Sequence, residues 1–322
     1  MTELIAILVA GLSVGTPILY ATVGETITEK CGNMTLGVEG VMLIGAVMGF
    51  ITGSRTGNPW LALLAAGVAG AVGTLLFGFL TITLRCNQTV TGLTLSIFGG
   101  GFANFVGNSY MGSRLPDSVL AVFSNIKIPV LGDIPVIGKI FFQQNILVYF
   151  SYILVIAVTI FMSRTNAGLN LRIIGENPGT ADSLGINVTK YKYLSVLISG
   201  FLCGIGGAYI CLVTIPTWQN NIVGGKGWIA VTLVIFTNWS VKNDFLGAML
   251  FGILTILGIY LQKYNLPISQ YFFDMLPYLL SSPVIPEWNS DPYLPCLHRR
   301  GFRIYAAILS ESGWLLCVCC RR

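Results

Sequence analysis

Residues 171–208 read LRIIGENPGTADSLGINVTKYKYLSVLISGFLCGIGGA, and this stretch decides the fold. Its second half is apolar and belongs to a longer apolar segment over 193–214. Gly200, Gly204 and Ala208 recur every four residues, a spacing that lines small side chains along one helix face and lets helices approach closely in lipid. The stretch therefore predicts a tightly packed membrane helix, preceded by a polar loop.

The polar half of this stretch encodes one short helix. Asn177 is a good N-cap, and Pro178 suits the first helical position. Ala181 and Asp182 continue the helix, and Gly185 can end it in the left-handed conformation. The pattern predicts a helix of about seven residues, roughly 10 Å long.

The surrounding loop, 164–192, carries basic residues at both ends: Arg164, Arg172, Lys190 and Lys192. Loops of this kind tend to lie in the cytoplasm. With this loop inside, seven Lys and Arg residues of positions 1–280 lie inside and six outside, so charge alone decides the orientation only weakly. A short capped helix outside the bilayer suits docking into another protein; the alternative is an ordinary connecting loop.

The composition excludes a soluble enzyme. Of 322 residues, 54% are hydrophobic and only 10% are charged, against about 25% in ordinary soluble domains. Disorder is excluded as well, because it needs low hydrophobicity and high charge. The net charge of +5 does not indicate nucleic-acid binding, since the body of the chain has no basic run with interleaved aromatic residues. A polytopic domain within the lipid bilayer is predicted.

Apolar segments predict an all-α transmembrane bundle of about eight spans, at 4–22, 36–52, 59–84, 88–108, 146–163, 193–214, 228–240 and 244–261. Between them, 109–145 is expected to be an irregular interfacial loop. Residues 88–108 contain the triplet Gly99–Gly101, and 228–240 covers only about 20 Å of a core about 30 Å thick. Both are predicted to be broken or re-entrant helices, which are typical of transport paths; the alternative is a kinked packing helix.

Motifs of catalysis are missing from the body of the chain. There is no GxxxxGK[ST], HExxH or GxSxG, and the GGKG at 224–227 lacks the flanking residues of a phosphate-binding loop. The single histidine, His298, lies near the C-terminus with Cys296, Cys317, Cys319 and Cys320, without the paired CxxC spacing of structural zinc sites. We therefore predict a transporter with no catalytic residue, metal or cofactor of its own.

Glu39 is the one ionisable residue early in the span 36–52. An intramembrane carboxylate is a candidate functional group on the transport path. The alternative is an interfacial glutamate that caps the start of a helix.

The stretch 171–208 resembles the coupling-loop region of ABC-importer permeases of the ribose and branched-chain amino-acid superfamily. More narrowly, GTPILYATVGETITEKCGNMTLGVEGVMLIGAVMGF (15–50) and FLTITLRCNQTVTGLTLSIFG (79–99) resemble the simple-sugar and nucleoside permeases, which work with a substrate-binding lipoprotein of the basic-membrane-protein type. The resemblance covers about residues 10–280. Such permeases pair, usually as heterodimers, and dock a separate ATPase.

The resemblance implies roles for individual residues. Glu176, Asn177, Pro178, Ala181 and Gly185 would form the cytoplasmic coupling helix. Asn87, Gln88, Thr91 and Gly92 would lie in the matching broken segment near the pathway.

Two regions depart from the family. Thr35-Leu36-Gly37 stands where relatives usually have Asn-aliphatic-Gly, which weakens any role for that turn. Residues 281–322 replace the end of a final apolar helix, of which 271–280 supplies only about 15 Å. We therefore divide the chain into a permease domain, 1–280, and an atypical tail, 281–322. A shifted reading frame would explain the tail; a divergent native tail is the alternative.

The expected function is that of the membrane-spanning subunit of a bacterial ABC importer for nucleosides or simple sugars, working by alternating access in the plasma (inner) membrane. A separate ATPase, a second permease subunit and an extracellular lipoprotein are the expected partners. The alternatives are a secondary carrier, which would need inverted repeats and paired intramembrane carboxylates, and an intramembrane enzyme.

Overall fold

The computed structural model describes residues 2–127, 137–262 and 275. Their helices are α1 (Thr2–Lys30), α2 (Val38–Thr56), α3 (Pro59–Gly78), the π-helix η1 (Phe79–Thr83), α4 (Gln88–Gly107), the 3-10 helix η2 (Asn108–Tyr110), α5 (Asp117–Val122), α6 (Ile137–Phe141), α7 (Ile146–Arg164), α8 (Asn166–Glu176), α9 (Pro178–Ser183), α10 (Val188–Tyr209), the π-helix η4 (Ile210–Thr214), α11 (Lys226–Phe236) and α12 (Val241–Gln262). The strands β1 (Ile126–Lys127) and β2 (Gln143–Gln144) form a short antiparallel pair.

Within the described ranges, seven helices are long and apolar enough to cross a membrane: α1, α2, α3 with η1, α4 with η2, α7, α10 with η4, and α12. The eleven-residue α11 is apolar but spans only about 16 Å. The predicted all-α polytopic bundle is therefore confirmed, and the segment predicted at 228–240 is a short helix. Apart from residue 275, the predicted helix at 271–280 and the tail 281–322 lie outside the described residues.

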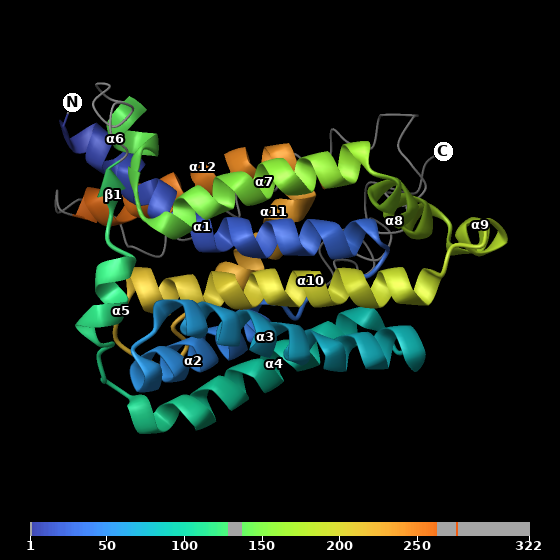
Figure 1. The fold of residues 1–322 in the computed structure, drawn as a ribbon, viewed down its shortest axis with the longest axis horizontal. Coiled ribbons are helices and arrows are strands. Elements are labelled where there is room, and N and C mark those ends of the chain that lie inside the picture. The colour runs from blue at the N-terminus through green and yellow to red at the C-terminus, as the bar shows by residue number, and fades with distance from the viewer. Residues whose placement is uncertain (1, 128–136, 263–274, 276–322) are drawn as a thin grey trace.

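The long helices lie side by side, with α1 and α10 at the centre of the bundle (Figure 1). Helix α10 packs against α1, α2 and α3, while α7 and α12 pack against α1, and α4 packs against α2. The short elements α5, α6 and β1 gather at one end of the bundle, and α9 projects from the other (Figure 1). The two ends are called here the α5 end and the α9 end.

Glycine contacts set the spacing of the central helices. A Cβ built on Gly45 of α2 would lie 2.5 Å from the carbonyl oxygen of Gly204, and one built on Gly70 of α3 would lie 2.9 Å from the Gly204 Cα. A Cβ on Gly204 itself would collide with the backbone of Ala66. The predicted small-residue face of α10 is thus the face on which α2 and α3 pack.

The prediction of a broken helix at 88–108 was wrong, because α4 is continuous from Gln88 to Gly107. Its glycines serve close packing instead of a break. A Cβ on Gly99 would lie 2.6 Å from the Cα of Gly40, whereas one on Gly101 would meet no atom within 4 Å. The segment is therefore a packing helix with one open face.

The first helix is longer than predicted, since α1 continues through the polar residues that follow position 22 and ends at Lys30. These residues are buried and bonded within the protein. Glu25 Oε1 accepts from the Thr35 amide at 3.0 Å, and Thr26 Oγ1 donates to Asp244 Oδ2 at 2.8 Å. The polar pattern marks a buried internal contact and not the end of the helix.

Candidate coupling and transport sites

Both ends of helix α9 are capped by neighbouring side-chain and backbone groups. Asn177 Oδ1 accepts from the amides of Gly179 and Thr180 at 3.0 and 3.3 Å, and Pro178 occupies the first turn. After the helix, Gly185 has a φ of +75° and the Ile186 amide donates to the Ala181 carbonyl at 3.0 Å. The predicted caps therefore form, although the helix has six residues instead of about seven.

Loop 164–192 contains two helices instead of the predicted one. Helix α8 precedes α9 and buries Leu171 and Ile174. Its Arg172 donates a hydrogen bond from Nη2 to the Met162 carbonyl at 2.6 Å. A Cβ on Gly175 would collide with the Lys30 carbonyl, so α8 lies directly on the end of α1. Through α8, the position of α9 is tied to the helix bundle.

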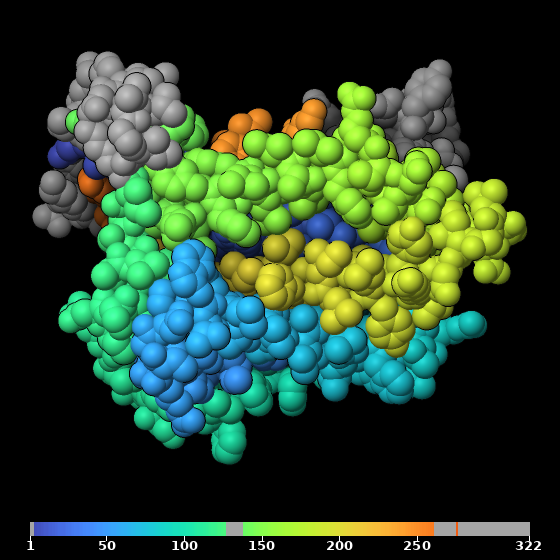
Figure 2. Space-filling view, in the orientation of Figure 1, coloured from blue at the N-terminus to red at the C-terminus, as the bar shows by residue number. Residues whose placement is uncertain are grey.

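The surface of α9 is open. Ala181 faces inward and is fully buried, whereas Glu176, Asn177, Thr180, Asp182 and Leu184 are exposed. Figure 2 shows α9 as a knob standing clear of the neighbouring helices. The structure thus brings Glu176, Asn177, Pro178, Ala181 and Gly185 together in one rigid, accessible projection.

The four pathway candidates on α4 cluster at its first turn. Asn87 Oδ1 caps the helix by accepting from the Thr89 and Val90 amides, and Thr91 Oγ1 donates to the Asn87 carbonyl at 2.8 Å. Gln88 Oε1 accepts from the Met34 amide at 2.9 Å, and a Cβ on the buried Gly92 would lie 2.5 Å from the Leu36 amide nitrogen.

These four residues lie toward the α9 end of the bundle. The turn that precedes Met34 is in contact with α8, since a Cβ on Gly32 would lie 3.3 Å from the Cα of Gly175. Asn87 and Thr91 retain exposed surface, while Gly92 is buried and serves packing.

Glu39 lies in the first turn of α2 and is 7% exposed. Its Oε1 accepts from the Gly225 amide at 2.9 Å and its Oε2 accepts from the Gly227 amide at 2.7 Å. These amides belong to the first turn of α11, whose N–H groups have no partner within the helix. Glu39 therefore caps a helix start, but the helix is α11 and not its own.

Of the two broken segments that the sequence analysis predicted, at 88–108 and 228–240, only the second has an interruption beside it, directly before α11. Residues 215–225 connect η4 to α11 without helical structure, and Gly224 and Gly225 have φ values of +61° and +83°. Gln219, Asn220 and Asn221 are exposed. Three consecutive carboxamides and two glycines mark where this break lies, a position that the sequence analysis did not predict.

Three acidic residues meet where α1, α11 and α12 come together. Glu29 Oε2 accepts from Trp239 Nε1 at 2.5 Å, and Asp244 accepts from the hydroxyls of Thr26 and Thr237. Glu25 is fully buried beside them. Among the described residues, no group of three or more His, Cys, Asp or Glu side chains could hold a metal ion. The arrangement joins helices that are distant in the sequence.

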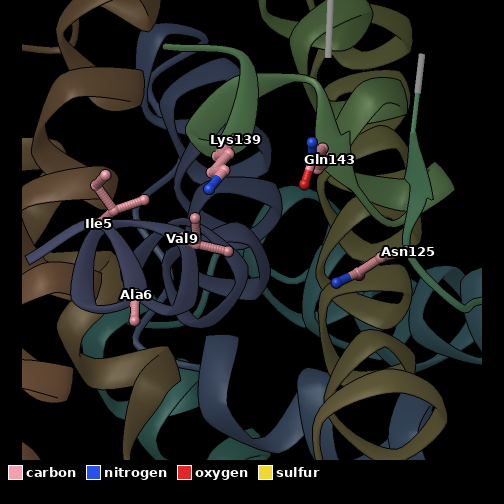
Figure 3. Close-up of a pocket in the computed structure, with 6 residues that line it drawn as sticks. All are labelled: Ile5, Ala6, Val9, Asn125, Lys139 and Gln143. Carbon is pink, nitrogen blue, oxygen red and sulfur yellow. The ribbon is translucent and has the colours of Figure 1, made fainter. Parts of the chain in front are cut away.

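A cavity of about 260 Å³ lies at the α5 end, lined by Ile5, Ala6, Val9, Asn125, Lys139 and Gln143 (Figure 3). Its floor is the first turns of α1, and the amine of Lys139 points into it (Figure 3). The cavity is small and mostly apolar.

Residues 7–281 match the family described as "Branched-chain amino acid transport system / permease component". The chain belongs to this permease family. TsgC13 of Haloferax volcanii, whose name describes a glucose ABC transporter permease, is 34% identical over 94% of this chain and 92% of its own length. NupQ of Bacillus subtilis, a guanosine ABC transporter permease protein, is 32% identical over 91% of this chain and 98% of its own length.

A second guanosine ABC transporter permease protein of Bacillus subtilis, NupP, is 23% identical over 79% of this chain and 72% of its own length. Among solved structures, a metal-chelate type ABC transporter in an inward-facing conformation has the same fold, with a TM-score of 0.51 and 15% identity over 87% of this chain and 85% of that chain. The permease is thus a multi-pass plasma-membrane subunit of an ABC importer, and the ATPase is a separate partner.

Proposed function

We propose that this permease carries nucleosides or simple sugars by alternating access. The observation that supports this substrate class is the similarity to NupQ and TsgC13, which extends over more than 90% of each chain. The name of each relative describes such a solute. The first turn of α4, with Asn87, Gln88, Thr91 and Gly92, lies near the proposed opening of the pathway at the α9 end. Glu39 holds the start of the broken helix beside it.

Helix α9 is the proposed docking element for the ATPase. It is capped at both ends, is tied through α8 to the end of α1, and projects from the bundle. Because a lone two-turn helix is not stable in water, it can transmit movement only as part of this supported unit. The α9 end of the bundle is then the cytoplasmic end.

The second permease subunit is proposed to be a different chain. NupQ and NupP, two guanosine permease proteins of one organism, match this chain at clearly different levels, 32% and 23%. A heterodimer of one close and one distant relative fits this pattern. An external lipoprotein is proposed to deliver the solute at the α5 end.

The test is uptake of labelled guanosine and labelled glucose by vesicles that contain the permease with its second subunit, ATPase and binding protein. We expect ATP-dependent uptake of one solute class, unaffected when ion gradients are collapsed. Uptake driven by an ion gradient without ATP would show a secondary carrier and refute the proposal. ATP-dependent transport of neither solute would refute the substrate class.

A further inference from the structure

Helix α11 lies between two non-helical connections. On one side, Gly224 and Gly225 have positive φ values, and a Cβ built on either would meet no atom within 4 Å. We call this pair the glycine hinge. On the other side, residues 237–240 alone separate α11 from α12, and we call them the α11–α12 turn. Moving elements pivot at a few such residues that absorb changes of φ and ψ, so α11 can change position as a rigid rod.

The α11–α12 turn is strained. Asn238 and Trp239 are consecutive residues with φ values of +57° and +49°. Asparagine tolerates this left-handed region, whereas a bulky residue such as tryptophan seldom adopts it. Strain of this kind persists only where the surrounding structure imposes it, and it is concentrated in switch regions. The turn therefore depends on contacts with other helices for its shape.

Two buried acidic residues supply these contacts. Glu29 of α1 is 3% exposed, and its Oε2 accepts a hydrogen bond from Trp239 Nε1 at 2.5 Å. Asp244 of α12 is fully buried and accepts from the hydroxyl of Thr237. Its other oxygen accepts from the hydroxyl of Thr26 of α1 at 2.8 Å. Both ends of the turn are thereby joined to the last turns of α1.

The same end of α1 also supports α8. A Cβ on Gly175 of α8 would collide with the Lys30 carbonyl, and a Cβ on Gly32 would lie 3.3 Å from the Gly175 Cα. The adjacent residues Glu29 and Lys30 thus contact the α11–α12 turn and α8. Helix α8 in turn carries α9, the proposed docking element for the ATPase. A continuous series of contacts therefore runs from α9 to α11.

We propose that α11 is the part of this subunit that moves when the ATPase acts, pivoting at the glycine hinge and at the α11–α12 turn, and that Trp239 and Thr237 are the positioning residues that tie its movement to α8. Displacement of α9 shifts the end of α1 through α8, and Glu29 and Asp244 pass the shift to the turn. A strained turn suits this role, because transmission needs an element with two discrete arrangements. The inference rests on the proposed docking role of α9 and extends it to a helix outside loop 164–192.

The experiment uses vesicles with the complete transporter and measures ATP hydrolysis and solute uptake in the same sample. Trp239→Phe keeps an aromatic ring and removes the donor to Glu29, and Thr237→Val keeps the shape and removes the donor to Asp244. Each variant should take up about tenfold less solute per ATP hydrolysed, the effect of losing one hydrogen bond to a buried acidic group. The ATPase should co-purify at the wild-type level, which verifies that each variant is folded.

Trp228→Phe and Thr232→Val are matched controls on α11. The Trp228 indole makes no hydrogen bond among the described residues, and the Thr232 hydroxyl donates only to the Trp228 and Ile229 carbonyls of its own helix. Both controls should keep the wild-type uptake per ATP.

A purely structural role of Trp239 and Thr237 would lower the amount of folded complex and leave the uptake per ATP unchanged. That result would overturn the inference, as would an equal loss in the two controls. Absence of uptake by the wild-type complex would instead refute the proposed function.

Discussion

Single residues hold the broken part of this bundle in place. Glu39 is bonded to amides 186 and 188 positions further along the chain, so one carboxylate joins α2 to the first turn of α11. The two helices are so close here that position 227 has no room for a side chain, because a Cβ on Gly227 would lie 2.5 Å from the Glu39 Cα. A negative group at a helix N-terminus is favoured by the free N–H groups and by the helix dipole.

We predict that Glu39→Ala destabilises the protein by about 2–4 kcal/mol, since it removes two charge-assisted hydrogen bonds to buried amides. Glu39→Gln should lose less, because its one oxygen still accepts from one of the two amides. Thermal unfolding in detergent measures both. Asp117→Asn, at the exposed first position of α5, is the control and should cost at most about 1 kcal/mol, because an exposed charge at a helix start contributes little. Equal stability of Glu39→Ala and the wild type would mean that the cap contributes nothing.

Substitutions of Gly185 test whether the conformation of loop 164–192 matters for function. A Cβ there would meet no atom within 4 Å, so any effect within this subunit comes from the φ of +75° and not from a clash. Gly185→Val should weaken ATPase co-purification and abolish uptake, while leaving membrane insertion intact. Gly185→Asn should be far milder, because asparagine tolerates the left-handed region at a lower cost than other residues. Normal transport by Gly185→Val would mean that loop 164–192 is an ordinary connector.

At the scale of elements, α10 is the helix on which the others are assembled. It contacts α1, α2 and α3, and its glycines let the α2 and α3 backbones come close. Helix α4 packs differently, burying Gly92 and Gly99 while leaving Gly101 open, which is why its glycine triplet does not break it.

We predict that Gly204→Ala lowers stability by about 1–3 kcal/mol, the usual effect of overpacking, since the new methyl group would collide with the Ala66 carbonyl. Gly100→Ala is the matched control, because the atom nearest to its Cβ is Leu43 Cδ1 at 3.8 Å. It should be neutral or slightly stabilising, since alanine favours the helix. Thermal unfolding compares the two; an equal effect would show that helix propensity and not contact decides.

At the scale of the whole molecule, the bundle has two chemically different ends. The α9 end carries α9, the proposed docking element for the ATPase, and the start of α4, and the α5 end carries the cavity of Figure 3. This asymmetry agrees with the proposed function, in which the solute is delivered at one end and the ATPase docks at the other.

The native Cys86 gives a direct test of orientation. It is exposed beside Asn87, toward the α9 end, whereas Cys31, Cys203 and Cys211 are buried. In a variant with Cys296, Cys317, Cys319 and Cys320 replaced by serine, a membrane-impermeant maleimide should label inside-out vesicles and not intact cells. Cys86→Ser should abolish the labelling. Labelling from outside would reverse the orientation and place α9 out of reach of the ATPase.

The sequence by itself determined the features that depend on neighbouring residues. The apolar segments predicted the spans, and Asn177, Pro178 and Gly185 predicted the caps of α9, because a cap needs only amides and carbonyls within a few positions. Only the tertiary structure decided which polar groups meet. In the sequence, Glu25 stands in a polar stretch that suggests a loop, whereas in the structure it accepts a hydrogen bond from the Thr35 amide. Glu39 accepts a hydrogen bond from the Gly225 amide, 186 residues further along the chain. The location of the break followed the same rule: glycines in α4 and before α11 look alike in sequence, and only packing against Gly40 distinguishes a contact from an interruption.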